Sequence, residues 1–414
     1  MIYTISKSPK SLIGEVHLPS SKSESNRALL IQALSQQKFT IANLSDAKDT
    51  IVLKDILENC HQENYFDVGP SGTAMRFLTA YFAGIPGTRT LTGSARMKER
   101  PLALLVEALR KLGANITYLE KEGYPPLKIE GAKLSGGSIV IDGSMSSQYL
   151  SALAMIAPTL PQGLIIKLSG EIISKPYLLM TLKMMERFGV KSSWKNAEIE
   201  IAPQSYSYTK TDSYVIEGDW SSASYWFQIA AFAKEVDFCM WGLKKESLQG
   251  DCSLVEYYQP LGVETTFLEG GIKLSKKPIH VPVDNIHIEL LQTPDIAQTL
   301  AVTYAAKEIY AELYGLRTLR IKETDRIKAL IAELKKIGVE AIDLDIGNLL
   351  IPKIKKSIHP PTAVFKTYDD HRMAMCLAPL SMLFDSVSIE NPEVVVKSYP
   401  HFWDDLKSVG FVIK

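Results

Sequence analysis

The feature that most constrains this chain is an internal repeat. Six times, a turn rich in Ser, Gly, Thr and Asp leads into an Ala-rich segment with helical character. The first interval between turns is 49 residues, and every later interval is 74 or 75 residues. The turns begin near Ser20, Gly69, Gly143, Gly218, Thr293 and Thr367. A fixed period of this length indicates one structural unit used repeatedly. We therefore expect six units, of which the first is shortened.

Each unit also contains a second predicted helix. These helices are predicted over residues 46–60, 99–112, 174–188, 251–261, 323–337 and 398–409. Glycine follows most of them, which is typical of a helix C-cap. Short runs of alternating polarity come next, such as residues 115–119, and this period is typical of strands in hairpins. The predicted unit is strand, helix, strand, helix and two strands.

The Ala-rich helices are apolar on nearly all sides, as residues 151–157 and 224–233 illustrate. A helix of this kind is usually buried. We infer an α/β fold with two lobes, each with three such helices inside and sheets outside. In the 414-residue chain this arrangement assigns three repeats to each lobe.

Charge and cysteine content narrow the possible functions. Lys and Arg together number 46, as do Asp and Glu, so the formal net charge is zero. That balance does not favour a nucleic-acid or membrane-surface role. The four scattered cysteines favour a reduced compartment and no zinc site. The first residues do not resemble a signal peptide, and the longest apolar stretches are too short to span a bilayer. We expect a cytoplasmic monomer.

The first turn, residues 20–27, is a candidate anion site. It combines Lys22, Ser23 and Arg27 with the start of a helical run. The first N–H groups of a helix are free to bind a ligand, and the helix dipole favours an anion there. The alternative is an ordinary serine N-cap beside two solvated cations.

Other turns carry similar groups. Gly72 allows close approach of the backbone to a ligand. Arg100 belongs to a run of three cations, for which a solvated charged surface is the alternative. Ser146, Ser147 and Gln148 begin a third helix, where a capping box would use the same residue types. Ser174 and Tyr177 begin the next.

Acidic and basic groups alternate in the last two turns and nearby. Asp295 follows Pro294, and Glu323 lies between Lys322 and Arg326, which would share a face if they were on one helix. A surface ion-pair helix would look similar. The run Asp369–Asp370–His371 could suggest a metal, but no second cluster has ligand spacing, so we expect none.

The turns together offer eight cations: Lys22, Arg27, Arg76, Arg100, Lys322, Arg326, Arg372 and Lys397. If the helix starts of both lobes face one cleft, these cations would bind substrates with several negative charges. Arginine grips phosphate and carboxylate in a bidentate manner. Asp295 and Glu323 beside them are natural proton carriers. A non-catalytic polyanion-binding module would explain the cations but not these two carboxylates.

These motifs resemble those of the 5-enolpyruvylshikimate-3-phosphate synthases over essentially the full chain. The matching stretches are S-K-S-E-S-N-R-A-L-L, G-T-A-M-R, R-M-K-E-R-P-L, S-S-Q-Y-L-S-A-L, S-K-P-Y, E-G-D-W-S-S-A-S-Y, P-D-I-A-Q-T-L-A-V, K-E-T-D-R-I and Y-D-D-H-R-M-A-M. The resemblance implies two lobes of three βαβαββ units. One lobe would comprise residues 20–217, and the other residues 1–19 and 218–414.

The resemblance also implies a reaction. The enolpyruvyl group of phosphoenolpyruvate would move to the 5-hydroxyl of shikimate-3-phosphate, with release of phosphate and without a cofactor. This is a step of the shikimate pathway, which leads to chorismate and the aromatic amino acids. Asp295 would take the hydroxyl proton, and Glu323, with Lys22 as the alternative, would protonate the methylene carbon.

The same resemblance assigns binding residues to each substrate. For shikimate-3-phosphate they are Lys22, Ser23, Arg27, Ser146, Ser147, Gln148, Ser174, Tyr177, Asp295, Thr318 and Lys322. For phosphoenolpyruvate they are Lys22, Gly72, Arg100, Gln148, Glu323, Arg326, Arg372 and Lys397.

The chain departs from the family pattern at Ser20, Pro70, Phe77 and Thr318, where Gly, Asn, Pro and Asn are usual. A sister family transfers the same group to a UDP-sugar and usually uses a loop cysteine. None of the four cysteines here lies in a matching turn.

Overall fold

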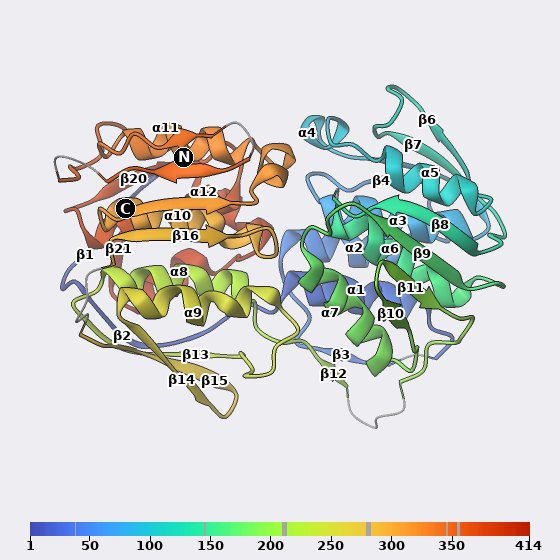
Figure 1. The fold of residues 1–414 in the computed structure, drawn as a ribbon, viewed down its shortest axis with the longest axis horizontal. Coiled ribbons are helices and arrows are strands. Elements are labelled where there is room, and N and C mark those ends of the chain that lie inside the picture. The colour runs from blue at the N-terminus through green and yellow to red at the C-terminus, as the bar shows by residue number, and fades with distance from the viewer. Residues whose placement is uncertain (38, 145, 209–212, 279–282, 345–346, 354–356) are drawn as a thin grey trace. The chain divides into compact units, whose positions relative to one another are not determined.

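The structure is a computed structural model that describes residues 1–37, 39–144, 146–208, 213–278, 283–344, 347–353 and 357–414. The chain divides into two compact units (Figure 1). The first unit, Met1–Ser21 with Glu217–Lys414, contains both termini. The second unit is the continuous segment Lys22–Ile216. Each unit is described by itself below.

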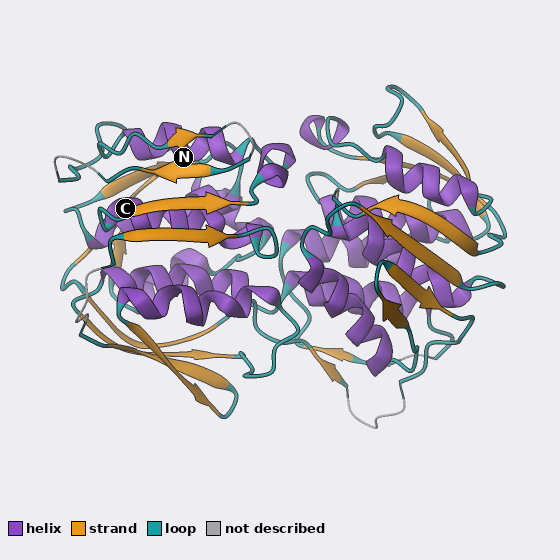
Figure 2. Cartoon of the chain, in the orientation of Figure 1, coloured by secondary structure: helices purple, strands orange, loops and turns teal. Residues whose placement is uncertain are grey.

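Two four-stranded sheets of one pattern cover the second unit (Figure 2). In each, two parallel strands are followed by an antiparallel hairpin. One sheet pairs β4 (Tyr65–Asp67) with β5 (Gly87–Thr92), then β7 (Leu127–Gly131) and β6 (Asn115–Tyr118). The other pairs β8 (Gly137–Asp142) with β9 (Leu164–Ser169), then β11 (Glu198–Ile201) and β10 (Ser193–Lys195).

Three helices pack together inside this unit: α1 (Lys22–Leu34), α3 (Gly72–Gly84) and α6 (Ser147–Ile156). Every residue of α3 from Gly72 to Ala83 is buried. Such a helix has no polar face to present to water, so it must lie within the core. The second helix of each repeat is α2 (Lys48–Asn59), α5 (Ala103–Lys111) or α7 (Lys175–Arg187).

The first repeat is shorter than the others. Its strand β3 (Ile41–Ala42) pairs in parallel with β12 (Tyr214–Val215), and these two form a sheet of their own. The chain then passes through α2 directly to β4. Among the described residues, no hairpin closes this repeat, which accounts for the 49-residue interval.

Two sheets of the first unit repeat this pattern, and in a third the three strands pair antiparallel. One sheet has the order β14 (Val263–Leu268), β15 (Gly271–Lys276), β13 (Glu235–Trp241) and β2 (Ser11–His17). The next has the order β16 (Asn285–Glu289), β17 (Tyr310–Tyr314), β19 (Leu349–Ile351) and β18 (Ile342–Asp343). In the third, the N-terminal strand β1 (Ile2–Lys7) lies between β20 (Val387–Glu390) and β21 (Phe411–Ile413).

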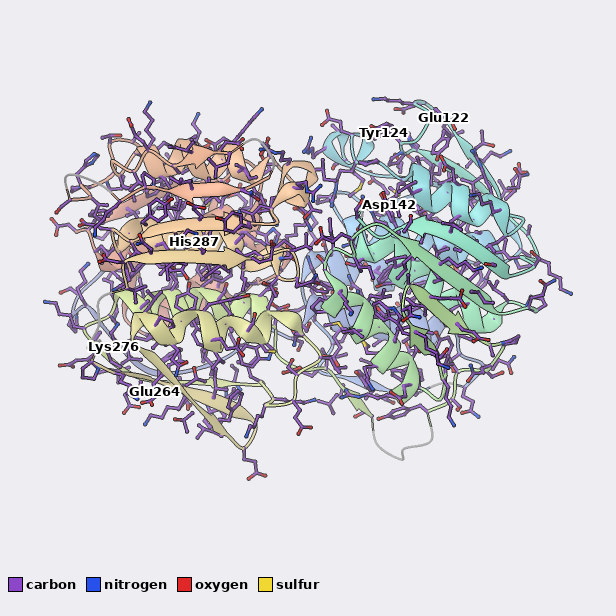
Figure 3. The ribbon with its side chains drawn as sticks, in the orientation of Figure 1. Glu122, Tyr124, Asp142, Glu264, Lys276 and His287 are labelled. Atoms are coloured by element: carbon purple, nitrogen blue, oxygen red, sulfur yellow. The ribbon has the colours of Figure 1, made fainter. Side chains whose placement is uncertain are left out.

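The outer faces of these sheets are solvated. The residues of β16 alternate between exposed and partly buried positions. Glu264 on β14 and His287 on β16 are labelled in Figure 3, and about half of each side chain is exposed. The inner helices are α8 (Trp220–Phe232), α10 (Ala297–Ala306) and α12 (His371–Leu377), and every residue of α10 and α12 is buried.

The second helices of this unit are α9 (Leu254–Tyr258), α11 (Arg326–Lys335) and α13 (Phe402–Ser408). All three are shorter than the predicted ranges 251–261, 323–337 and 398–409. The predicted helix 323–337 begins only at Arg326, because the Asp325 side chain accepts a hydrogen bond from the Lys328 N–H and caps it there. The predicted helix 251–261 is split into α9 and two flanking 3-10 turns, η2 (Gly250–Ser253) and η3 (Gln259–Leu261).

Two predicted helix starts are therefore wrong, at residues 323 and 99. Lys322 follows the 3-10 turn η5 (Arg317–Ile321) with an extended backbone and precedes α11, so it and Arg326 do not lie on one helix. The helix predicted over residues 99–112 begins only at Ala103, as α5, and the short helix α4 (Ala95–Lys98) precedes it. Within the described ranges, no helix has the length and apolar character needed to cross a membrane.

Candidate active site

The first unit gathers a group of charged side chains that we call the acid–base cluster. It lies at the N-terminal ends of α10, α11 and α12 and beside the 3-10 turns that precede α10 and α13. Its members are Asp295, Lys322, Glu323, Arg326, Asp370, Arg372 and Lys397. At the start of a helix, the free N–H groups and the positive end of the helix dipole both favour a bound anion, and the first side chains of the helix lie beside that position.

Arg326 is the centre of the acid–base cluster. Its guanidinium donates to Asp295 at 3.3 Å, to Glu323 at 3.0 Å and to Asp370 at 2.7 Å. The arginine side chain is 2% exposed. Burial by itself would lower the pKa of Arg326, but the carboxylates of Asp370 and Glu323 outweigh it and hold the pKa above its usual value. The guanidinium is therefore a permanent cation that fixes two predicted proton carriers.

Further cations contact the same two carboxylates. Arg372 lies 3.4 Å from Asp295, and the Lys322 Nζ lies 3.8 Å from it. Lys397 lies 2.8 Å from Glu323. Asp295 and Glu323 retain 20% and 13% exposure, more than Arg326, Arg372 and Lys397 but less than Lys322 at 25%. A substrate anion could compete for these cations without dismantling the core.

Asp370 has a structural role that the sequence motif alone did not reveal. It is fully buried, accepts two hydrogen bonds from Arg326 and accepts the Arg372 backbone N–H at 2.9 Å. Its carboxylate therefore caps α12 and holds the backbone of Arg372 in place. The neighbouring His371 is also buried, with Nδ1 3.5 Å from the Asp370 carboxylate. The prediction of no metal at this triplet stays a prediction.

The second unit gathers a separate group that we call the hydroxyl–arginine cluster. Its members lie at the N-terminal ends of α1, α3, α6 and α7, except Arg100, which follows α4 and reaches Gly72 at the start of α3. Its members are Lys22, Ser23, Arg27, Gly72, Arg76, Arg100, Ser146, Ser147, Gln148, Ser174 and Tyr177. All the binding residues predicted between residues 22 and 177 belong to this set.

Arg27 connects three helices of the second unit. Its guanidinium donates to the Thr181 hydroxyl at 2.7 Å, to the Ser151 hydroxyl at 3.1 Å, and to the backbone oxygens of Ser23 and Tyr177. Burial lowers the pKa of Arg27 to about 10, which still leaves it charged at neutral pH. The arginine therefore orients α1 against α6 and α7 and brings positive charge to the helix starts.

Gly72 allows two guanidinium groups to approach the backbone. A Cβ atom at this position would lie 2.7 Å from Arg100 Nη1 and 2.8 Å from Arg76 Nη1. Arg76 also donates to the Gly72 carbonyl at 2.9 Å. Both arginines are nearly buried, with 4% and 8% exposure. A side chain at position 72 would push these two guanidinium groups aside, so glycine leaves room for their present positions.

The remaining predicted residues make contacts of different kinds, and Ser146 caps α6. The Ser146 side chain accepts the Gln148 N–H at 3.3 Å, and Gln148 donates to the Thr73 hydroxyl at 3.1 Å. Ser174 precedes α7 with a left-handed backbone, at φ +55°. Lys22 forms an ion pair with Asp49 of α2 at 3.1 Å. Thr318 lies in η5, and its buried hydroxyl has no hydrogen-bond partner within the described part of the chain.

Two acids that contact the predicted site residues, Asp49 and Asp370, could not be assigned from the sequence. Asp49 carries no local signal, because it lies within a helix 27 positions from Lys22. Asp370 was visible within the D-D-H-R run, but its contact with Arg326 spans 44 positions. Only the fold brings such pairs together.

The chain matches one protein family over most of its length. The model of one family, described as EPSP synthase (3-phosphoshikimate 1-carboxyvinyltransferase), matches residues 6–65 and 55–406. The chain belongs to the EPSP synthase family.

Curated relatives and solved structures extend this result over the whole chain. A 3-phosphoshikimate 1-carboxyvinyltransferase of Bacteroides fragilis is 44% identical over 100% of this chain and 99% of its own length. One from Sulfurovum sp. is 37% identical, with 96% of each chain covered. The EPSP synthase structure from Acinetobacter baumannii has a TM-score of 0.78 and 19% identity, covering 100% of this chain and 99% of its own.

These similarities confirm two predictions. The family predicted from the motifs is the one whose model matches. The predicted two-lobed α/β fold class is confirmed by the likeness to the EPSP synthase structure. The relatives are named as transferases of phosphoshikimate, so the UDP-sugar alternative is not favoured.

Proposed function

We propose that this protein is a 3-phosphoshikimate 1-carboxyvinyltransferase. It transfers the enolpyruvyl group of phosphoenolpyruvate to the 5-hydroxyl of shikimate-3-phosphate and releases inorganic phosphate. The observation that carries the proposal is the pair of carboxylates, Asp295 and Glu323, held 3.3 and 3.0 Å from one buried guanidinium. A mere polyanion binder would have no use for two acids among its cations.

The proposed chemistry uses each carboxylate once in each direction. The 5-hydroxyl oxygen attacks C2 of phosphoenolpyruvate while Asp295 accepts its proton, and Glu323 gives a proton to C3. In the resulting intermediate, C3 is a methyl group and C2 bears both the new C–O bond and the phosphate. Loss of a methyl proton to Glu323 and cleavage of the C2–O bond to phosphate, which takes up the proton held by Asp295, then restore the enol ether and the starting state of both carboxyl groups. Lys22 is the alternative proton donor to C3.

Electrostatics explain how Glu323 could carry a proton. In the structure, Arg326 and Lys397 hold it at 3.0 and 2.8 Å, which favours the carboxylate. The phosphate and carboxylate groups of phosphoenolpyruvate compete for the same two cations. Once they engage Arg326 and Lys397, the hold on Glu323 weakens, and its carboxyl group can exchange protons with the substrate. The cations then stabilise the charge that develops on the phosphate oxygens.

The proposed binding residues divide by substrate. Shikimate-3-phosphate is bound by Lys22, Ser23, Arg27, Ser146, Ser147, Gln148, Ser174, Tyr177, Asp295, Thr318 and Lys322. Phosphoenolpyruvate is bound by Lys22, Gly72, Arg100, Gln148, Glu323, Arg326, Arg372 and Lys397. Support for the phosphoenolpyruvate set comes from its four buried cations, Arg100, Arg326, Arg372 and Lys397, because cations of this kind hold phosphate and carboxylate groups.

We also propose that residues 20–217 form one domain and that residues 1–19 and 218–414 form the other. The division of the chain into compact units at Ser21 and Glu217 supports these boundaries. The proposed setting is a cytoplasmic monomer that binds small-molecule substrates and neither nucleic acid nor membranes.

Phosphate release tests the proposed function. The purified chain is incubated with phosphoenolpyruvate alone, with shikimate-3-phosphate added, or with a UDP-sugar added, and the organic product is identified by mass spectrometry. We expect release only with shikimate-3-phosphate, with one enolpyruvyl ether formed per phosphate. Release that ignores the second substrate would reject the proposal, and release only with the UDP-sugar would favour the sister activity.

A further inference from the structure

A buried carboxylate outside both clusters holds the segment that carries Arg372. Glu333 lies on α11, two helical turns after Arg326, and is fully buried. It accepts hydrogen bonds from the Lys366 backbone N–H at 2.9 Å and from the Tyr368 hydroxyl at 2.7 Å. Lys336 on the same helix completes the site at 2.6 Å. The carboxylate therefore has one ionic partner and two partners on the segment before α12.

That segment contains a strained turn. The Asp370 N–H donates to the Thr367 carbonyl at 2.9 Å and closes a four-residue turn. Both central residues, Tyr368 and Asp369, have positive φ, at +53° and +54°. Turns with two such residues favour Gly, Asn and Asp, and a bulky aromatic residue there is a conformational outlier. A conformation of this kind persists only where the surroundings hold it.

The helix α11 holds this turn at both ends. Arg326, at the start of the helix, binds the carboxylate of Asp370, which follows the two strained residues. Glu333 binds Lys366 before them and the Tyr368 side chain within them. Arg372 is two residues beyond Asp370 and contacts Asp295 at 3.4 Å. A change in the turn would therefore alter the direction of the Arg372 side chain at the start of α12.

We propose that Glu333 is a positioning residue for phosphoenolpyruvate binding: it keeps the turn at residues 367–370 in its left-handed conformation and so directs Arg372 into the acid–base cluster. This inference deepens the proposed function and rests on it. If Glu333 only stabilised the fold, its ion pair with Lys336 would be enough. The contacts that matter here are the two on the strained segment.

The protonation of Tyr368 is consistent with this role. Burial first, and then the hydrogen bond and the charge of Glu333, raise the pKa of Tyr368 above its usual value. The hydroxyl group therefore remains a donor at any pH at which the protein would be assayed.

Two substitutions test the proposal from opposite sides of one hydrogen bond. Tyr368→Phe removes the hydroxyl group and keeps the ring. Glu333→Gln keeps the shape of the side chain, but its amide N–H₂ group then faces the Tyr368 hydroxyl or the Lys366 N–H, which are donors. Both are expected to raise the KM for phosphoenolpyruvate about tenfold, with kcat changed less than threefold and the KM for shikimate-3-phosphate unchanged. The double variant should be no worse than the poorer single one, because both remove the same contact.

Two further variants separate positioning from stability. Tyr258→Phe is the matched control, because it removes another buried tyrosine hydroxyl, 2.9 Å from Thr303, that does not touch the turn. It should lower the unfolding midpoint without changing either KM. Asp369→Gly should partly restore the KM of Glu333→Gln, because glycine adopts positive φ without strain.

Several results would overturn the inference. One is a KM for phosphoenolpyruvate within twofold of wild type in folded Tyr368→Phe protein, which remains informative even if Glu333→Gln fails to fold. Another is an equal rise for both substrates. A wild-type protein without turnover would instead reject the proposed function. In that case the inference is tested by calorimetry with inorganic phosphate. We expect Tyr368→Phe to bind phosphate more weakly than Tyr258→Phe does. Equal affinities of the two variants would reject the inference.

Discussion

Asp251 offers the sharpest test of the electrostatics in the first unit. It lies in η2, is 2% exposed, and its Oδ2 atom pairs with the Ser221 hydroxyl at the start of α8. Its Oδ1 atom has no hydrogen-bond partner among the residues described. Burial and then the charge of Asp295 raise the pKa of Asp251 to about 7, although Ser221 and Arg372 act in the opposite direction. We predict that this carboxyl group is largely protonated in slightly acidic solution.

The sign of the pH effect follows from proton binding. In the unfolded chain Asp251 has a pKa near 3.8, so between pH 4 and 7 the folded state binds more protons than the unfolded state. The stabilisation from this proton is complete below pH 4 and is lost as the pH rises through 7. A shift of about 3 pKa units corresponds to about 4 kcal/mol in total, of which about 3 kcal/mol is lost between pH 5 and 8.

Asp251→Asn removes the titration and keeps the shape of the side chain. We expect the free energy of unfolding of this variant, relative to wild type, to rise by about 3 kcal/mol between pH 5 and pH 8. The measurement is a series of urea titrations at half-unit pH intervals. Asp404→Asn is the control, because that carboxylate is 73% exposed. A difference between Asp251→Asn and wild type that stays constant with pH would refute the reasoning.

Three other predictions concern single side chains. Asp295→Ala or Glu323→Gln should each lower kcat at least about 100-fold with little change in shikimate-3-phosphate affinity, and near-normal turnover would remove that proton carrier. Arg100→Ala should raise the KM for phosphoenolpyruvate at least about tenfold, because a bidentate grip is lost; an unchanged value would argue against direct binding. Burial lowers the pKa of Lys276, labelled in Figure 3, to about 8. Acylation followed by mass spectrometry should therefore reach half its maximal rate at a lower pH for Lys276 than for Lys273 on the same strand, whose pKa is raised by the hydrogen bond to Asp237. Coincident pH profiles would contradict this.

Local sequence predicted the elements of the fold well, because their signals are local. The period of 74 or 75 residues reflects a unit that buries its own apolar helix, and α3 and α10 are buried as their composition requires. The same local reasoning placed the start of the helix predicted over residues 323–337 too early. A run of charged residues does not by itself show where a helix begins, and the Asp325 cap decides that point.

Contacts between distant residues could not be predicted in this way. The pairing of Arg326 with Asp370, of Lys22 with Asp49 and of Glu333 with Tyr368 joins residues that are 44, 27 and 35 positions apart. Nothing in the neighbouring sequence distinguishes these acids from solvated ones.

The sequence by itself determined that cations and hydroxyl groups stand at the helix starts, because turn and helix signals depend on neighbours within a few residues. Only the tertiary structure decided which carboxylate each buried cation meets. Burial makes an unpaired charge costly, so the fold must bring a partner from elsewhere in the chain.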